Sequence, residues 1–277
     1  MGRRVRFAMG SLSLAVVAIG CGGGSPAPAS KSSGDVLRVI QAAASTTSQQ
    51  KSMQLRGTMT MDLGTGSSVS FAMTGAMQTK PFIARMTMSG LSVAGRSLGD
   101  ITALMTPAAM YMQMPTLESM TGKPWVEIKF SELKSMSGVD LSQIATQAQQ
   151  MQPSQYIAQL TASGDVHVVG IETINGIRTT HYSGTVSMQD ALSHYNAATR
   201  AQLEPLLQRA GFTSSTIDVW LDSFGLVRRT KTSANGGKGS FTFDGDILRY
   251  GVQVDATPPP SSQVADFAQI AKSGSMG

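Results

Sequence analysis

The chain has 277 residues, enough for one large domain or two small ones, and 41% of them are hydrophobic, so it can bury a core. Only 14% are charged, and the single cysteine excludes an internal disulfide and a cysteine-ligated metal cluster. The formal charge of +5 includes Arg3, Arg4 and Arg6, and without these three arginines it is +2, which is too weak a balance to imply a nucleic-acid-binding surface or a polybasic membrane surface.

The first twenty residues have the layout of a secretion signal. A basic start is followed by an apolar run from Phe7 to Ile19 and then by small Gly20 and Cys21. The segment AIGC at 18–21 resembles the lipobox of bacterial lipoproteins, with Ala18 where that pattern usually has Leu. The resemblance implies that residues 1–20 are removed and that Cys21 is acylated and becomes the new N-terminus. The alternative is an uncleaved anchor helix with a structural cysteine.

Residues 21–34 are rich in Gly, Ser and Pro and are expected to form a flexible tether behind the acylated cysteine. The folded part is predicted to be a single domain at residues 35–270, with a disordered tail at 271–277. It starts with a short helix near Asp35. No stretch after residue 20 has the ~18 continuous apolar residues of a membrane-spanning helix.

From Met53 the pattern changes to strict alternation of apolar and polar side chains, which predicts a long half-buried strand up to Leu63. Several shorter alternating runs follow, and each is broken by Gly, Pro or another turn residue. Strands with short connections predict an antiparallel meander. The predicted further strands of this half are 68–79, 81–90, 100–107 and 108–115.

The middle of the chain has helical spacing, and residues 130–163 predict two or three short helices, one of them starting at Pro153. A hairpin is expected next, with strands at 165–176 and 177–187 joined at Asn175-Gly176. Residues 188–211 predict a helix that ends at Gly211 and is bent or split at Pro205. A second meander follows, in which TSANGGKGSF is a hairpin turn. The C-terminal residues form a proline-stopped loop and a short amphipathic tail.

This order of elements predicts an α+β fold in which one extended antiparallel sheet curls around a few central helices. Four segments, taken in order after a lipobox, resemble the LppX/LprA/LprF/LprG family of mycobacterial lipoproteins over residues 35–268. The resemblance implies a curved half-barrel, related to the periplasmic lipoprotein carriers, that encloses an apolar cavity for lipids or lipoglycans. The segments are KPWVEI (123–128), GDVHVVGIETINGIRTTHYSGTVS (164–187), DVWLDSFGLVRR (218–229) and GVQVDATPPPSSQVADF (251–267).

Methionine sets this chain apart from the family: 13 of its 18 methionines lie between residues 53 and 136, several of them two residues apart. A methionine side chain is flexible and polarizable, so a face rich in methionine can fit acyl chains of variable shape. Two alternatives are ordinary core packing and a Cu(I) site built from the thioethers of 110–114. The predicted cavity-wall residues are Met59, Met61, Phe71, Met73, Met86, Met88, Met110, Met112 and Met114.

Candidates for catalysis or metal binding are few. His167, His181 and His194 lack metal-ligand spacing, and the first two are interpreted as half-exposed residues on the two strands of the predicted hairpin. Trp125 and Trp220 are interpreted as core or rim residues. The chain has no nucleophile elbow and no paired carboxylates with glycosidase spacing. We therefore predict a protein that is not an enzyme and that uses no metal and no cofactor.

The leading hypothesis is a lipid-binding lipoprotein, anchored through Cys21 on the extracytoplasmic face of the cell membrane, that carries or presents a lipid or lipoglycan by burying its acyl chains. We expect a monomer of actinobacterial origin that does not bind nucleic acid, with a transporter as a candidate partner. The alternatives are a Cu(I)-binding, methionine-rich lipoprotein and a signalling or assembly lipoprotein that docks a protein partner.

Overall fold

The computed structural model describes residues 33–272, except for 63, 65–67, 94, 133–152 and 194–196. The predicted signal segment, Cys21 and the residues up to 32 lie outside the described residues, as do His194 and the tail from 273. Most of the helical region predicted at 130–163 also lies outside them. Among the helices that the structure describes, none is long and apolar enough to cross a membrane.

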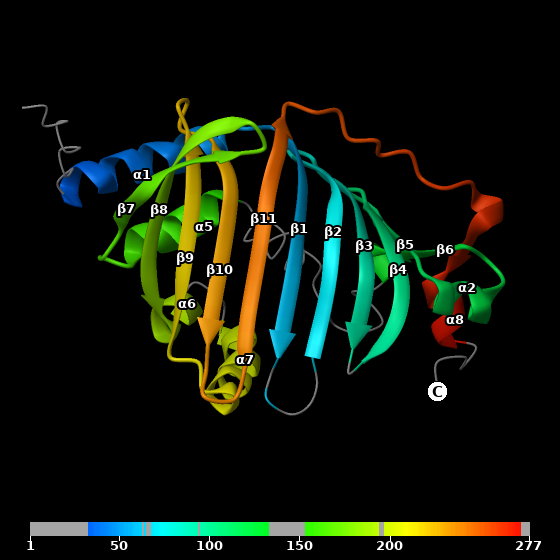
Figure 1. Cartoon of the computed structure of the whole chain (residues 1–277). Helices are drawn as coiled ribbons and strands as arrows, with labels where there is room; N and C mark the ends of the chain where they lie inside the picture. The colour runs from blue at the N-terminus through cyan, green and yellow to red at the C-terminus, as the bar shows by residue number, and fades with distance from the viewer. Residues whose placement is uncertain are drawn as a thin grey trace, which may run out of the picture. The chain divides into compact units, whose positions relative to one another are not determined.

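Within the described residues, a single sheet of twelve strands forms the body of the protein (Figure 1). Its spatial order is β12-β6-β5-β4-β3-β2-β1-β11-β10-β9-β8-β7. It is curved and does not close on itself, so β12 and β7 are its two edges (Figure 1). The strands are β1 (Ser52–Asp62), β2 (Ser68–Thr79), β3 (Phe82–Val93), β4 (Arg96–Met105), β5 (Ala109–Gln113), β6 (Trp125–Lys129), β7 (His167–Ile174), β8 (Ile177–Ser187), β9 (Ser214–Asp222), β10 (Val227–Asn235), β11 (Ser240–Tyr250) and β12 (Val264–Asp266).

Two meanders, β1–β6 and β7–β11, join into this one sheet because β1 pairs with β11 from Met53 to Asp62. All neighbouring strands are antiparallel apart from β12, which runs parallel to β6. The predicted α+β fold with a curved antiparallel sheet is confirmed. Asn175 and Gly176, with φ of 49° and 80°, make the predicted tight turn between β7 and β8.

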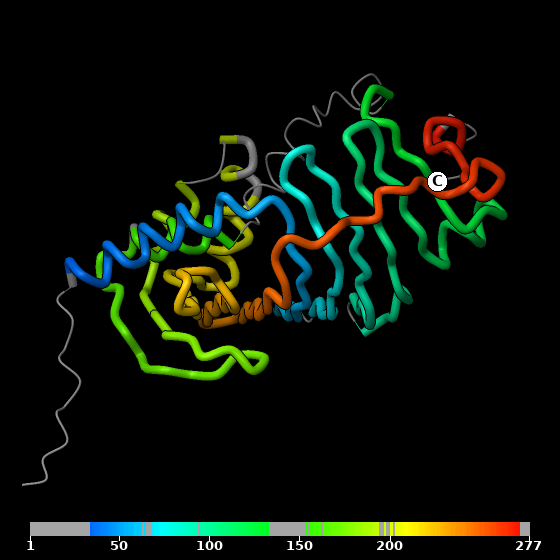
Figure 2. Tube along the Cα trace, turned by 90° about the horizontal axis from the view of Figure 1, so that it is seen from above, coloured from blue at the N-terminus to red at the C-terminus, as the bar shows by residue number. Residues whose placement is uncertain are grey.

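Four of the helices that the structure describes lie over one face of the sheet, which we call the inner face: α1 (Ser33–Ser48), α5 (Pro153–Ala162), α6 (Met188–Ser193) and α7 (Ala197–Ala210) (Figures 1 and 2). Two more, α2 (Pro115–Thr121) and α8 (Phe267–Lys272), lie near the β6–β12 edge, where a short 3₁₀ turn at Ser261–Gln263 precedes β12. As predicted, a helix starts at Pro153, and α7 ends before Gly211, whose φ is 78°. The predicted bend or break at Pro205 does not end α7, which continues through this exposed residue to Ala210.

The main core lies where α1 and α5 pack on the inner face. Residues at helical spacing on α1, namely Val36, Ile40 and Ala43, are buried against α5 and the sheet. From α5, Ile157 and Leu160 are fully buried in the same cluster. This core covers only part of the inner face, on the side of α1 and α5, and includes the strand residues Met53, Met77, Ala84, Tyr182, Val186, Ile217, Val219, Leu221, Val227 and Ile247.

Candidate functional site

Eight of the nine predicted wall residues lie on the same face of the sheet, the inner face. The strand register pairs some of them directly, and it links others through a residue of the strand between them, as Ala103 of β4 links Met86 and Met112. Directly paired residues of neighbouring antiparallel strands point to the same face. Met59 pairs with Phe71, and Met73 pairs with Met88. We call the eight residues the methionine wall: Met59, Met61, Phe71, Met73, Met86, Met88, Met110 and Met112.

The same strands carry the wall and part of the core, which identifies the wall face as the inner face. Met53 and Met77 pair with each other across β1 and β2, and both are buried in the core. Met59 lies on β1 at an even spacing from Met53, so the two side chains point the same way. The residues between wall positions, such as Thr58 and Thr60, are exposed on the other face.

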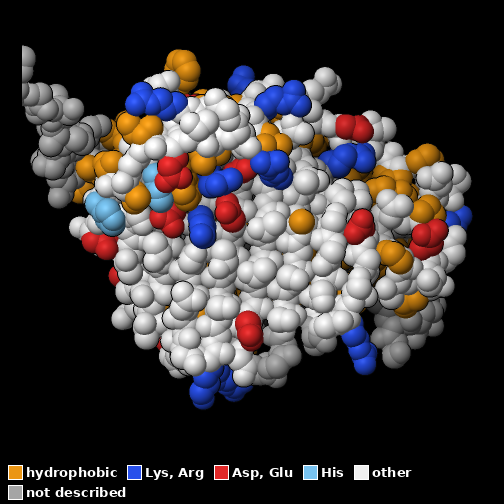
Figure 3. All heavy atoms as spheres, in the orientation of Figure 1, with side chains coloured by type: hydrophobic (Ala, Val, Ile, Leu, Met, Phe, Trp, Pro, Cys, Tyr) orange, Lys and Arg blue, Asp and Glu red, His pale blue; other side chains and the backbone are white. Residues whose placement is uncertain are grey.

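The wall residues differ from the core residues in their exposure. Met53 is 2% exposed and Met77 is 8% exposed, whereas every residue of the methionine wall keeps an intermediate exposure. Large apolar side chains on a concave face therefore retain surface that a second molecule can cover. In the view of Figure 3, which faces the other side of the sheet, few hydrophobic side chains are seen over the central strands.

Met114, the ninth predicted wall residue, lies just beyond β5 and precedes α2. Its backbone is extended, with φ of −155° and ψ of 147°, but no strand pairing places it beside the other eight. Tyr111, which alternates with the methionines of β5, donates a hydrogen bond from its hydroxyl to Glu127 Oε1 at 2.8 Å. Burial and this hydrogen bond raise the pKa of Tyr111 to about 12.

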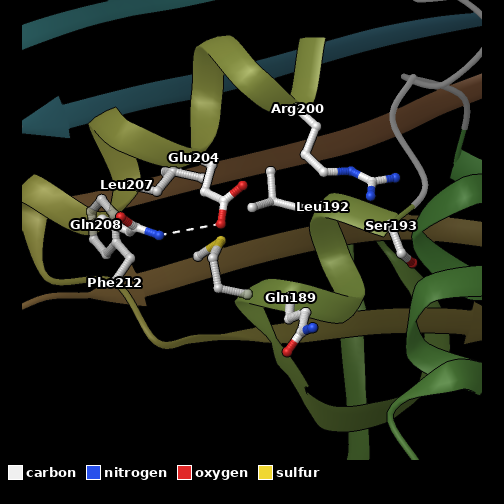
Figure 4. Close-up of a pocket in the computed structure, with 9 residues that line it drawn as sticks. Gln189, Leu192, Ser193, Arg200, Glu204, Leu207, Gln208 and Phe212 are labelled. Atoms are coloured by element: carbon white, nitrogen blue, oxygen red, sulfur yellow. Dashed lines mark hydrogen bonds between the residues drawn. The ribbon is translucent and has the colours of Figure 1, made fainter. Parts of the chain in front are cut away.

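A pocket of about 500 Å³ lies between α6 and α7 (Figure 4). Its polar side chains include Arg200 and Glu204 of α7, and the carboxylate of Glu204 accepts a hydrogen bond from Gln208 Nε2 at 3.2 Å. In Figure 4, Glu204 and Leu192 point into the space between the two helices. The full lining is Met188, Gln189, Leu192, Ser193, Arg200, Glu204, Leu207, Gln208 and Phe212.

The apolar part of this pocket adjoins one end of the methionine wall. Leu207 and Phe212 belong to a small cluster that also contains Phe241 of β11. Phe241 pairs directly with Met61, so the cluster and the wall share the inner face. The α6–α7 pocket therefore offers polar groups beside the last residues of an apolar surface. This pocket could not be predicted from the sequence, because its polar residues have the spacing of an ordinary solvated helix face.

His167 and His181 lie on the outer face of the sheet, and the contacts of His181 are structural. His181 stacks on Trp220 with ring centres 4.0 Å apart, and its two ring nitrogens lie 2.8 Å from Glu172 Oε1 and 2.9 Å from Asp218 Oδ1. Trp220, which is buried, donates from Nε1 to Glu172 Oε2 at 3.0 Å. These contacts hold β7, β8 and β9 together. Within the described residues, no group of three His, Cys, Asp or Glu side chains could hold a metal ion.

Asp246 of β11 is the centre of a second hydrogen-bond network on the outer face, and this network attaches the β7–β8 hairpin to the sheet. It accepts hydrogen bonds from Arg229 Nε at 2.6 Å, Arg56 Nη2 at 3.0 Å and Asn175 Nδ2 at 3.0 Å. Burial alone would raise the pKa of Asp246, but these three hydrogen bonds outweigh it and hold the pKa below its usual value. In Figures 1 and 2 the hairpin crosses the outer face, in agreement with the contact of Asn175.

Comparison with known proteins shows the fold and two sequence relatives, while no protein-family model matches the chain. The crystal structure of LprF from Mycobacterium bovis superposes with a TM-score of 0.55 at 15% identity, covering 83% of this chain and 99% of LprF. The fold expected from the four sequence segments is therefore confirmed.

Both sequence relatives come from Streptomyces. An uncharacterized 31.2 kDa protein of Streptomyces griseus is 32% identical over 156 residues, which are 55% of this chain and 51% of the relative. A predicted lipoprotein of Streptomyces coelicolor is 28% identical over 166 residues, 59% of this chain and 50% of the relative. The chain thus spans about half the length of the curated relatives that it matches.

Proposed function

We propose that the protein is a lipid-binding lipoprotein, anchored through acylated Cys21 on the extracytoplasmic side of the membrane, that carries or presents a lipid in a cavity over the inner face of its sheet. The observation that carries this proposal is the methionine wall: eight large apolar side chains on one concave face, none of them fully buried. The lipobox-like segment at 18–21 and the predicted lipoprotein among the sequence relatives support the anchor.

The binding step is physical partition and requires no covalent chemistry. Each buried methylene contributes about 0.8 kcal/mol, so an acyl chain with ~12 buried methylenes gains nearly 10 kcal/mol before the cost of ordering it. A broad apolar surface can therefore retain a lipid with little help from polar groups. Methionine suits such a surface because its thioether side chain can repack around chains of different length and shape.

The α6–α7 pocket is a suitable place for the polar head group of the same lipid. It lies beside Phe241 and Met61, where the wall ends, and it presents a guanidinium and a carboxylate on neighbouring turns of α7. A lipid with its acyl chains along the wall would then place its head group at the helices and not inside the apolar surface, where desolvating it would be costly.

Binding of a fluorescent acyl probe to the soluble form, residue 22 onward, tests the proposal. Leucine at Met110 and Met112 keeps the apolar surface but removes the sulfur atoms, so this double variant should bind the probe as the wild type does. The Cu(I) alternative predicts a stoichiometric Cu(I) complex that the same variant loses. Absence of probe uptake by the wild-type protein would contradict the lipid-binding proposal.

A further inference from the structure

Five large apolar side chains are exposed together at one end of the sheet. They come from α1, from the edge strand β7 and from the turn between β9 and β10. We call them the apical patch: Val39 (37% exposed), Val168 (39%), Val169 (52%), Ile171 (60%) and Phe224 (79%). Figure 3 shows hydrophobic side chains gathered at the upper left of the view, over these elements, with Lys and Arg side chains beside them.

Pairing and packing bring the parts of the patch near one another. Ile171 pairs with Thr180 of β8, which pairs with Leu221 near the end of β9. Two strand spacings of about 4.8 Å therefore separate Ile171 from the strand that leads into the β9–β10 turn. On the other side of that turn, a Cβ built on Gly225 would lie 3.9 Å from Ala43 of α1. The edge strand, the β9–β10 turn and α1, which carry the patch, therefore lie near one another at one end of the molecule.

The turn that carries Phe224 is held firmly in place. Asp222 has a side chain that is only 2% exposed, and its Oδ1 accepts hydrogen bonds from the N–H groups of Phe224 at 2.9 Å and Leu226 at 3.0 Å. Its Oδ2 accepts one from Arg228 Nε at 2.7 Å, and Gly225 has a φ of 74°. These bonds fix the backbone of the turn that places Phe224 at the surface, although burial of such a ring is normally favourable.

The predicted anchor lies close to the same end in the chain. Twelve residues lead from Cys21 to Ser33, the first residue of α1, and they can span at most about 40 Å. Val39 follows about 9 Å farther along the helix, and Ala43 about 15 Å farther. Arg178 is exposed on β8, while Arg38, exposed on α1, forms an ion pair with Asp35 in the preceding turn, so these two arginines add little net charge beside the apolar side chains. Exposed apolar side chains such as these fit the interface of a lipid bilayer.

We propose that the apical patch rests on the lipid surface of the membrane that holds the acyl anchor, with Phe224 inserted at the interface. A single acylated residue fixes only the distance of a protein from its membrane, and a second contact fixes its orientation. The proposal rests on the predicted acylation of Cys21. It is independent of cargo binding on the inner face.

Depth-dependent fluorescence quenching tests the contact. The acylated full-length mature protein is reconstituted on vesicles of phosphatidylcholine and phosphatidylglycerol, with or without bromine atoms on the acyl chains. Trp is introduced at Phe224 in one variant and at Leu98, which is 37% exposed at the opposite end of the sheet, in the control variant. The wild type supplies the background from Trp125 and Trp220. Brominated lipid should quench the added fluorescence of the Phe224→Trp variant and leave that of the Leu98→Trp variant unchanged.

Ile171→Trp gives a second reading at the other side of the patch and should be quenched as well. Equal quenching of the patch variants and the Leu98→Trp variant, or no quenching of any of them, would overturn the proposal. A blue shift of the Phe224→Trp emission that depends on protein concentration and not on lipid would indicate a second copy of the chain, and would also overturn it. Loss of bound cargo would leave these results unaffected, so the two proposals fail separately.

Discussion

Replacement of Met88 by glutamine tests the methionine wall where two of its residues face each other. Met88 of β3 pairs directly with Met73 of β2, so their Cβ atoms stand about 4.5–5.5 Å apart on the inner face. Glutamine has a similar length but ends in an amide. If acyl chains cover this surface, the amide must lose its water and finds no partner among methylene groups.

The size of the effect follows from the partial burial of Met88. Full burial of a methionine side chain is worth about 1.5–3 kcal/mol, so covering the part of Met88 that is still exposed, at most about a third, contributes roughly 0.5–1 kcal/mol to binding. Burying an unsatisfied amide costs about 1–3 kcal/mol. Together these terms predict a loss of about 2 kcal/mol, or roughly 30-fold in the dissociation constant of an acyl probe. The stability without ligand should change by less than about 1 kcal/mol, because the site is already partly hydrated.

Fluorescence titration with a long-chain acyl probe measures this loss, and urea denaturation measures the stability of the same variants. Thr87→Gln is the matched control, because Thr87 adjoins Met88 on β3 and points to the outer face, where it contacts Thr102. The control should bind the probe like the wild type. Equal weakening by both variants, or no weakening by either, would refute the assignment of the wall as the binding surface.

Three further predictions concern Asp246 and the α6–α7 pocket. Asp246→Ala should lower the free energy of unfolding by about 2–3 kcal/mol in urea denaturation, because Arg229 and Arg56 lose a buried partner but are exposed enough to be rehydrated. The control is Asp244→Ala, which should cost less than about 1 kcal/mol because the side chain of Asp244 is 36% exposed. Equal losses in the two variants would contradict this prediction. The pKa of Asp246 is lower in the folded protein than in the unfolded chain, so its carboxylate stabilises the fold fully above the unfolded pKa of about 3.9, and this stabilisation is lost as the pH falls through the folded pKa. The urea midpoint should therefore be constant above about pH 5 and fall below about pH 4. The fall should be less steep in Asp246→Ala. Arg200→Gln should weaken binding of anionic lipids roughly tenfold more than that of neutral lipids, measured by competition with the probe, and an equal loss for both would exclude a head-group contact.

Much of the sheet could be predicted from local patterns. Alternation between Met53 and Leu63 and the Asn175-Gly176 turn each depend on neighbouring residues, and both features are present. The pairing of β1 with β11 could not be predicted in this way, because it joins residues about 190 positions apart and depends on the packing of the whole domain. β12 was also missed, since three residues parallel to β6 carry no periodicity of their own.

The candidate site was also predicted only where it depends on local sequence patterns. Alternation predicted that Met59 and Met61 share a face, and the register adds which strands bring the other wall residues beside them. The α6–α7 pocket and the Asp246 centre needed the tertiary structure, because each combines side chains from separate elements. The exposure of Phe224 could not be predicted either, because a single aromatic residue in a turn has no sequence pattern that distinguishes a buried ring from an exposed one.

Mass spectrometry of the lipids that copurify with the protein tests the central claim most directly. The soluble form, residue 22 onward, is produced in a lipid-containing host, purified without detergent and extracted with organic solvent, in parallel with a variant carrying glutamine at Met73 and Met88. If acyl lipids bind to the methionine wall, the wild-type extract should contain a defined set of them at a near-constant ratio to protein, and the variant should show a marked loss. Repeated absence of lipid from the wild-type protein, together with failure to take up an acyl probe, would contradict this claim.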